Sequence, residues 1–257
     1  MTMDGSQVIL AAHRGDRVKH PENTMAAMRS AVEFGVDMIE TDVRRTKDGV
    51  LVLCHDRSAV RTTGVDRNID EITLQEFKAL RSQGEELPTV AEFIDYVRQC
   101  RVLVNWELKV YPEDFGDEVA FSVADQLIQM ILDSGIEELS MVNSFSDRVL
   151  EHIVENHGHR FPVHGQGIGP CRRSHDDPQV PEEELFDWCC MYADRPDAGV
   201  VDCPQGFLHC QANGILPCVC IKDTRENYEK ALALGCRMFT TNDLYTCHAL
   251  LQELGVR

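Results

Sequence analysis

Two acidic residues and a histidine stand close together between positions 38 and 56, and their types and spacing suggest metal and proton chemistry. Glu40 and Asp42 are two residues apart in a predicted strand, so both carboxylates point to the same face. Paired carboxylate oxygens are typical ligands of a hard divalent cation. An Asp48-Gly49 turn and a short apolar run then bring the chain to His55. One hairpin-like unit would therefore carry two acids and an imidazole.

Polar residues also follow two other predicted strands. The first strand of the chain is followed by His13 and Arg14, and another strong strand ends in Glu107 and Lys109. Taken alone, His13 could be an ordinary hydrogen-bonded loop residue, and Glu107 with Lys109 an ordinary ion pair. The repetition favours a site, because the carboxyl ends of parallel strands meet at one mouth of an α/β barrel.

These residue types together are typical of phosphodiester chemistry. The carboxylates of Glu40, Asp42 and Glu107 favour Mg²⁺ or Ca²⁺ over Zn²⁺, since the sequence shows no Cys or His cluster at metal-binding spacing. Two imidazoles can divide the proton transfers, one removing a proton from the attacking oxygen and the other protonating the leaving oxygen. The neighbouring basic side chains can neutralise phosphate oxygens.

Strands and helices alternate along the chain, which predicts the elements that position these residues. The expected fold is α/β, a (β/α)8 TIM barrel with a short insertion after strand 2, in a single domain over residues 1–257. Predicted barrel strands cover residues 7–12, 36–43, 101–109, 138–142, 160–164, 199–202, 215–221 and 237–240. Predicted helices cover residues 25–34, 73–80, 89–99, 115–134, 147–156, 205–212 and 224–234.

Local signals mark several boundaries within this pattern. Thr73 and Thr89 are each followed three residues later by a glutamate, the capping-box pattern at the start of a helix. Gly35 is a helix stop. Residues 57–70 are expected to form a loop, and Gly165 to Gln179 a long loop at the barrel mouth that could influence substrate selectivity.

Composition narrows the range of partners. The formal net charge of −18 argues against a nucleic-acid partner, because binding a polyanion depends on basic patches. No apolar run is long enough to cross a bilayer and the N-terminus lacks a signal-peptide pattern, so we expect no integral membrane contact. The eleven cysteines are odd in number and several lie in apolar runs, which favours reduced thiols and a cytoplasmic location. The sequence leaves monomer and homodimer open.

The motifs in the first 110 residues or so resemble those of the glycerophosphodiester phosphodiesterase family. The match comprises, in the family's order, HRG at 13–15, PENT at 21–24, ETDVRRTKDG at 40–49, HD at 55–56 and ELK at 107–109. The resemblance implies a (β/α)8 barrel that cleaves a small-molecule glycerophosphodiester to glycerol 3-phosphate and an alcohol. It also implies one divalent cation held by Glu40, Asp42 and Glu107, with Mg²⁺ or Ca²⁺ expected and Mn²⁺ possible.

The same resemblance implies roles for the remaining site residues. His13 and His55 would be the acid-base pair, and Arg14 and Lys109 would bind the phosphate of the substrate. A related phosphodiesterase acting on a lysophospholipid or another phosphodiester remains an alternative, as does a non-catalytic phosphate-binding barrel. The two intact histidines argue against the last of these.

The chain departs from the family pattern at two places in its second half. Cys220-Ile221-Lys222-Asp223 stands where the family commonly has a tryptophan followed by Thr-Val-Asn, so the expected aromatic wall is missing. Thr241-Asn242 stands where the family has Thr-Asp. We expect both changes to affect contacts to the substrate's alcohol or glycerol part, and neither to touch the metal or proton-transfer residues. The alcohol itself stays open.

Overall fold

Eight parallel strands close into a barrel, as the alternation of strands and helices predicts. The computed structural model describes residues 3–192 and 204–257. The barrel closes because β1 pairs with both β2 and β11. Its strands are β1 (Ile9–His13), β2 (Met38–Arg45), β6 (Leu103–Leu108), β7 (Ser140–Ser144), β8 (Val163–Gln166), β9 (Trp188–Tyr192), β10 (Leu216–Cys220) and β11 (Met238–Thr241).

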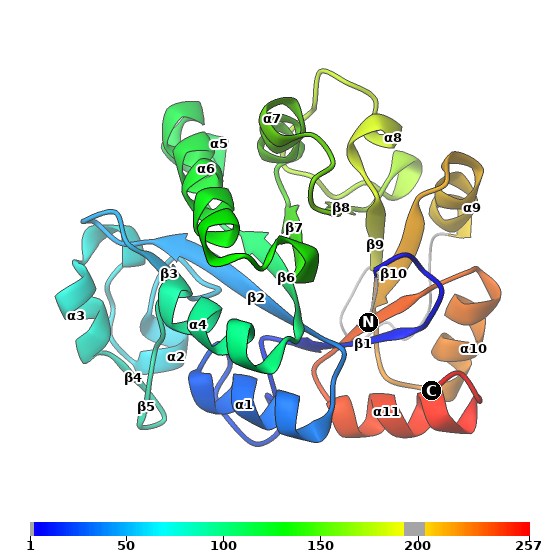
Figure 1. Ribbon diagram of the computed structural model, residues 1–257, viewed down its shortest axis with the longest axis horizontal. Coiled ribbons are helices and arrows are strands. Elements are labelled where there is room, and N and C mark those ends of the chain that lie inside the picture. The colour runs from blue at the N-terminus through cyan, green and yellow to red at the C-terminus, as the bar shows by residue number, and fades with distance from the viewer. Residues whose placement is uncertain (1–2, 193–203) are drawn as a thin grey trace.

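Helices surround this barrel and bury its outer face (Figure 1). Apolar side chains of strands and helices together form one large core, in which Trp106, Phe93 and Phe161 are fully buried. The longer helices are α1 (Met25–Phe34), α4 (Val90–Cys100), α6 (Asp117–Ser134), α7 (Asp147–His157), α9 (Pro204–Asn213), α10 (Arg225–Ala233) and α11 (Leu244–Glu253). Short helices α5 (Pro112–Phe115) and α8 (Glu182–Leu185) lie between them in sequence.

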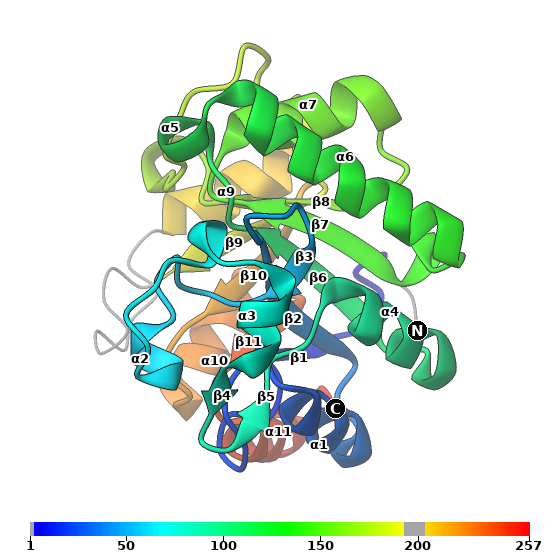
Figure 2. The same ribbon diagram turned by 90° about the vertical axis from the view of Figure 1, so that its left-hand side faces the viewer.

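An insertion follows β2 and lies beside the barrel (Figure 2). Strand β3 (Leu51–Leu53) runs antiparallel to the end of β2, and the turn between them contains Gly49 with φ of 87°, a conformation that suits glycine. The insertion continues through α2 (Val60–Thr63), α3 (Leu74–Ala79), β4 (Arg81–Ser82) and β5 (Glu85–Glu86). It has its own apolar cluster, made of Val52, Cys54, Ala59, Ile69, Ile72, Phe77, Leu80 and Leu87.

Helix ends match the local signals in the sequence. Thr73 and Thr89 each accept a hydrogen bond from the backbone of the glutamate three residues later, and each glutamate bonds back, so both predicted capping boxes are present. Gly35 ends α1 in the left-handed conformation at φ of 92°. These boundaries depend on a few neighbouring residues, which is why the sequence reveals them.

The structure corrects the prediction in four segments. The sixth barrel strand is β9 at Trp188–Tyr192, which was not predicted, and the predicted strand at 199–202 lies outside the described residues. Helix α11 was also missed. The predicted loop at 57–70 contains α2 and a 3₁₀ turn at Ile69–Glu71. The predicted strand at 138–142 begins only at Ser140, because a 3₁₀ turn precedes it.

Two further expectations concern the membrane and the cysteines. No helix among the described residues is long and apolar enough to span a membrane. Nine cysteines of the described part of the chain are free thiols, as expected, whereas Cys171 is disulfide-bonded, so the expectation of reduced thiols is wrong at that position.

Candidate active site

Strand register places the three predicted metal-binding carboxylates side by side. Asp42 of β2 lies opposite Glu107 of β6, and Glu40 lies opposite His13 of β1. All three acids are buried, and one oxygen from each can be chosen so that the three atoms lie within 4.8 Å of one another. The sequence predicted this set, and the closed barrel explains how acids 65 residues apart (42 and 107) come together.

The carboxylates have oxygens that the protein itself does not satisfy. Both side-chain oxygens of Glu40 are buried without a hydrogen-bond partner among the described residues, whereas Oδ1 of Asp42 and Oε1 of Glu107 are buried beside the ammonium of Lys109. Burial, together with the neighbouring acids, raises the pKa of Glu40 well above its ordinary value. Burying carboxylate oxygens without a partner costs free energy, and a bound hard divalent cation would offset that cost. The residues present therefore fit a divalent-cation site.

His13 lies at the end of β1 beside these acids. Its Nε2 is 3.7 Å from Glu40 Oε2, and its Nδ1 is 2.7 Å from Asn242 Oδ1. Because the amide oxygen accepts, Nδ1 carries the proton of the neutral ring and Nε2 holds a lone pair. Burial and the adjacent Arg14 guanidinium lower the pKa of His13 to about 3, so the ring is neutral at pH 7.

The contact with Asn242 corrects one expectation from the sequence. The change from Thr-Asp to Thr241-Asn242 was expected not to touch the proton-transfer residues, and this is wrong because Asn242 contacts the His13 ring. The two residues are 229 positions apart, and only the pairing of β1 with β11 brings them together. The resemblance implies a carboxylate at this position, whereas here an amide oxygen faces His13 Nδ1 and favours the tautomer that carries its proton there.

His55 follows the hairpin strand β3 and lines the same cavity as His13. Its Nδ1 is 2.6 Å from Asp56 Oδ1, so the carboxylate accepts the Nδ1 proton and leaves Nε2 with a lone pair. Arg44 donates from Nε to the backbone oxygen of His55 at 2.8 Å, which fixes the end of the hairpin. Burial lowers the pKa of His55.

Arg14 and Lys109, the predicted phosphate-binding residues, are both paired with acids. Lys109 Nζ contacts Glu107 Oε1 and lies 3.4 Å from Asp42 Oδ1. Arg14 Nε lies 3.1 Å from Asp42 Oδ2, and its Nη1 donates to Glu22 at 3.0 Å. Burial opposes the charged form of Lys109, but Glu107 and Asp42 outweigh it and raise the pKa of its ammonium. Both cations therefore stay charged beside the carboxylates.

The PENT segment supplies positioning residues that the sequence alone did not assign. Asn23 donates to Asp42 Oδ2 at 2.8 Å and accepts from Thr41 Oγ1 at 2.8 Å. Glu22 accepts hydrogen bonds from Arg14 and from Arg61 of the insertion. Asn23, with φ of 55°, and Arg14, with φ of 64°, are in the left-handed region, where non-glycine residues are strained. The segment thus connects the barrel acids to the insertion that carries His55.

Of the predicted site residues, all but Asp42 line one cavity of about 150 Å³ at the carboxyl ends of the strands. Phe145 forms part of its wall and lies under Lys109, whose Nζ is 5.3 Å from the ring centroid. The sequence suggested that an aromatic wall was missing after β10, and Phe145 after β7 supplies an aromatic face instead. The lining residues are His13, Arg14, Glu40, His55, Asn105, Glu107, Lys109, Asn143, Phe145, His164, Gln166, Cys190, Cys220 and Thr240.

Of the residues in the second half of the chain that the sequence singled out, some line the cavity and others do not. Cys220 lines the cavity, whereas Lys222 is exposed and is not part of the described lining. From the predicted loop at Gly165–Gln179, only Gln166 reaches the cavity, and it belongs to β8. Arg172 of the same segment instead binds Asp147 at the start of α7. The role of this loop in selectivity stays a prediction.

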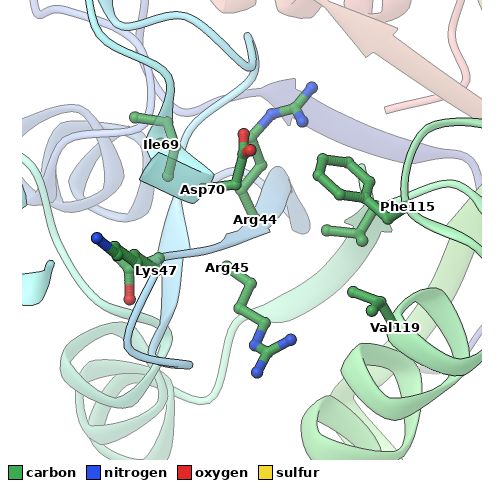
Figure 3. Close-up of a pocket in the computed structure, with 9 residues that line it drawn as sticks. Arg44, Arg45, Lys47, Ile69, Asp70, Phe115 and Val119 are labelled. Atoms are coloured by element: carbon green, nitrogen blue, oxygen red, sulfur yellow. The ribbon is translucent and has the colours of Figure 1, made fainter. Parts of the chain in front are cut away.

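A second cavity, of about 180 Å³, lies between the β2–β3 hairpin, the insertion and α6 (Figure 3). Arg44, Arg45 and Lys47 line it together with the apolar side chains of Phe115 and Val119. It contains one acid, Asp70, and no histidine. The residues capable of proton transfer and cation binding belong to the smaller cavity.

The chain matches one protein family over most of its first two thirds. The model of the glycerophosphoryl diester phosphodiesterase family matches residues 13–177. A relative named glycerophosphodiester phosphodiesterase, from Caldanaerobacter subterraneus subsp. tengcongensis, is 35% identical over 159 residues, which are 57% of this chain and 62% of the relative. The match thus spans about three fifths of that relative's length.

Solved structures of the same kind share the whole fold. A glycerophosphodiester phosphodiesterase from Parabacteroides distasonis superposes with a TM-score of 0.78 at 20% identity, covering 97% of this chain and 100% of the other. A phosphodiesterase from Oleispira antarctica, solved in complex with the product sn-glycerol-3-phosphate, gives a TM-score of 0.78 at 20% identity over 95% of this chain and 96% of the other. At this identity the likeness concerns the fold. Together with the match over residues 13–177, the barrel and its motifs show that the chain belongs to the glycerophosphoryl diester phosphodiesterase family.

Proposed function

We propose that the chain hydrolyses glycerophosphodiesters to glycerol 3-phosphate and an alcohol. The observation that carries the proposal is a cluster of three buried carboxylates, of which Glu40 and Glu107 line one cavity together with two neutral imidazoles and two cationic side chains. Relatives named glycerophosphodiester phosphodiesterase and a structural neighbour with sn-glycerol-3-phosphate bound support the same reaction.

Glu40, Asp42 and Glu107 would hold one divalent cation, with Mg²⁺ or Ca²⁺ preferred and Mn²⁺ also suitable for oxygen ligands. When bound, such a cation supplies charge neutralisation to a phosphodiester as it reacts. It would compete with the Lys109 ammonium for the oxygens of Glu107 and Asp42. Lys109 and Arg14 then neutralise phosphate oxygens, which is their role in this proposal.

His13 and His55 carry out the proton transfers. Each neutral ring is held with its Nδ1 proton bonded to an oxygen, so each Nε2 is free to accept a proton. One histidine removes a proton from the attacking oxygen, and the other, in its imidazolium form, protonates the leaving oxygen. The negative charge of the bound diester favours that imidazolium form. The attacking oxygen belongs to water or to a neighbouring hydroxyl of the glycerol.

Substitution of the two histidines tests this assignment. We expect His13→Ala and His55→Ala each to lower kcat by about 10²-fold or more, because each removes one proton transfer. Cation affinity should change little in both variants, since neither ring is a proposed ligand. His152→Ala is the matched control, because His152 lies on α7 away from the cavity. Full turnover in either variant would refute the acid-base assignment.

A substrate panel separates this function from its alternatives. Turnover of water-soluble glycerophosphodiesters should disappear with EDTA and return with Mg²⁺, Ca²⁺ or Mn²⁺. Turnover restricted to lysophospholipids would indicate the lipid alternative. Binding of glycerol 3-phosphate without turnover of any diester would indicate a non-catalytic phosphate-binding barrel.

A further inference from the structure

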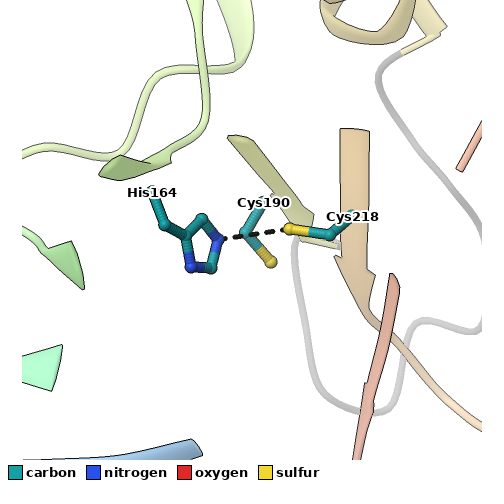
Figure 4. Close-up of side chains that lie close together, drawn as sticks. All are labelled: His164, Cys190 and Cys218. Carbon is teal, nitrogen blue, oxygen red and sulfur yellow. Dashed lines mark hydrogen bonds between the residues drawn. The ribbon is translucent and has the colours of Figure 1, made fainter. Parts of the chain in front are cut away.

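One histidine and two cysteines from neighbouring strands converge inside the barrel (Figure 4). His164 of β8, Cys190 of β9 and Cys218 of β10 are all buried. His164 Nε2 lies 3.2 Å from Cys218 Sγ, and with Cys190 Sγ the three ligand atoms lie within 4.8 Å of one another. The sequence showed no Cys and His cluster at metal-binding spacing, because these residues lie 26 and 28 positions apart on three strands. The pairing of β8 with β9 and of β9 with β10 brings them together, with Cys218 directly opposite Cys190.

This set of side chains differs in chemistry from the carboxylate site. Thiolate sulfur and imidazole nitrogen are soft or borderline ligands that favour Zn²⁺, whereas carboxylate oxygens favour Mg²⁺ and Ca²⁺. Two cysteines and one histidine form a known zinc ligand set that leaves a fourth position for water. His164 and Cys190 line the cavity of about 150 Å³, which gives that fourth position access to water.

The surroundings of His164 can accommodate its role as a ligand. Its Nδ1 is 2.9 Å from Asn105 Nδ2, Asn105 Oδ1 accepts from Asn143 at 2.8 Å, and Asn143 Oδ1 accepts from Gln166 at 3.2 Å. A half-turn of all three amides reverses every donor and acceptor without moving the chain. His164 Nδ1 then donates its proton to Asn105 Oδ1, and Nε2 is free to bind a metal. Metal-binding histidines usually make such a bond to an oxygen.

We propose that His164, Cys190 and Cys218 form a binding site for Zn²⁺, distinct in its residues from the site of Glu40, Asp42 and Glu107. Neither cysteine is disulfide-bonded in the structure. On binding, each thiol loses its proton to solvent and the sulfur becomes a thiolate ligand, while His164 binds through Nε2 as a neutral imidazole. No oxidation or reduction takes place. The proposal does not depend on the phosphodiesterase reaction.

A titration with Co²⁺, which reports thiolate coordination by its colour, tests the site. The reduced protein is titrated with excess Mg²⁺ present, so that the carboxylate site is occupied by a hard ion. We expect thiolate-to-cobalt charge-transfer absorption in the near ultraviolet that saturates at one equivalent and is removed by Zn²⁺. Cys190→Ser, Cys218→Ser and His164→Gln should each weaken Co²⁺ binding by about 10-fold or more.

Two controls separate this site from the rest of the chain. Cys100→Ser, which alters a free thiol on α4, should leave the titration unchanged. Asp42→Asn removes a ligand of the proposed Mg²⁺ site and should also keep the charge-transfer band, so failure of the phosphodiesterase proposal is distinguishable from failure of this one. A band that is absent in the wild type, or unchanged in Cys218→Ser, would overturn the zinc site.

A measurement on the wild type alone covers the case in which a variant does not fold. Crystals soaked in Zn²⁺ should show anomalous density between His164 Nε2 and the sulfurs of Cys190 and Cys218. Calorimetry in buffers of different ionisation enthalpy should show proton release on Zn²⁺ binding. Anomalous density confined to other positions, such as His152 and His157 beside Asp125, would contradict the assignment.

Discussion

Asn242 shows how a single side chain can control the chemistry of another without being part of the reaction. Its amide oxygen accepts from His13 Nδ1 at 2.7 Å and also from Arg17. A neutral amide fixes the tautomer of the ring but gives the imidazolium less support than a carboxylate does. This is consistent with the low pKa of His13, which is about 3.

Asn242→Asp should therefore move the pH dependence of catalysis. A carboxylate facing Nδ1 stabilises the protonated ring and raises the pKa of His13, so the limb of the kcat/KM profile that reports His13 should shift to higher pH by about one unit or more. The measurement is a pH profile of kcat/KM. Asn156→Asp, at an exposed position on α7, is the control. Superimposable profiles for Asn242→Asp and wild type would exclude a role of this contact in proton transfer.

Site residues could be predicted from the sequence where one short motif contains both the residue and the neighbours that indicate its role. Glu40, Asp42 and Glu107 follow from strand ends, and the structure brings them together. The partners of His13 and His164 come from distant strands, so no local pattern could reveal them. The roles of His13 and His55 stay predictions that the substitutions above test, and the roles of Arg14 and Lys109 stay predictions.

At the level of elements, the starts of helices that begin with a capping box were predictable from the sequence. Thr89 and Glu92 form a reciprocal pair, with Glu92 N donating to Thr89 Oγ1 at 3.1 Å and Thr89 N donating to Glu92 Oε2 at 2.7 Å. Strand β9 was harder, since WCCMY is a short apolar run without alternation, which periodicity alone cannot distinguish from a buried helical segment. The sequence thus revealed the boundaries of those helices whose first residues form capping hydrogen bonds.

Thr89→Ala should destabilise the protein by about 1 kcal/mol, because it leaves donors at the start of α4 without their side-chain acceptor. The measurement is the free energy of unfolding from urea denaturation. Ser122→Ala, at an exposed position within α6, is the control and should change the free energy by less than about 0.5 kcal/mol. Equal effects of the two substitutions would contradict the capping role.

At the level of the whole molecule, a net charge of −18 coexists with three carboxylates that are buried close together. Arg14 and Lys109 form ion pairs with Asp42. A divalent cation bound at this point would stabilise the native state, since the unfolded chain has no such assembled site.

Added Mg²⁺ or Ca²⁺ should raise the free energy of unfolding by about 2.7 kcal/mol at a concentration 100 times the dissociation constant. Ionic strength is held constant with a monovalent salt, so that screening of the overall negative charge does not contribute. Asp42→Asn should abolish the stabilisation, while Asp95→Asn, at an exposed site on α4, should retain it. A stabilisation of the same size in Asp42→Asn would mean that the cation binds elsewhere.

The insertion has a small apolar core of its own, separate from the large core of the barrel. The residues of the candidate site are divided between these two parts. His55 follows β3 in the insertion, whereas the three carboxylates lie on strands of the barrel. A small core of eight residues supports less stability than the large one, so we expect the insertion to unfold locally while the barrel stays intact. Native-state hydrogen exchange should then show faster exchange at Ala59 and Phe77 than at Val104. Such opening would leave a subpopulation that still binds its cation but lacks one of its two imidazoles, so turnover would fall with rising temperature before cation affinity does.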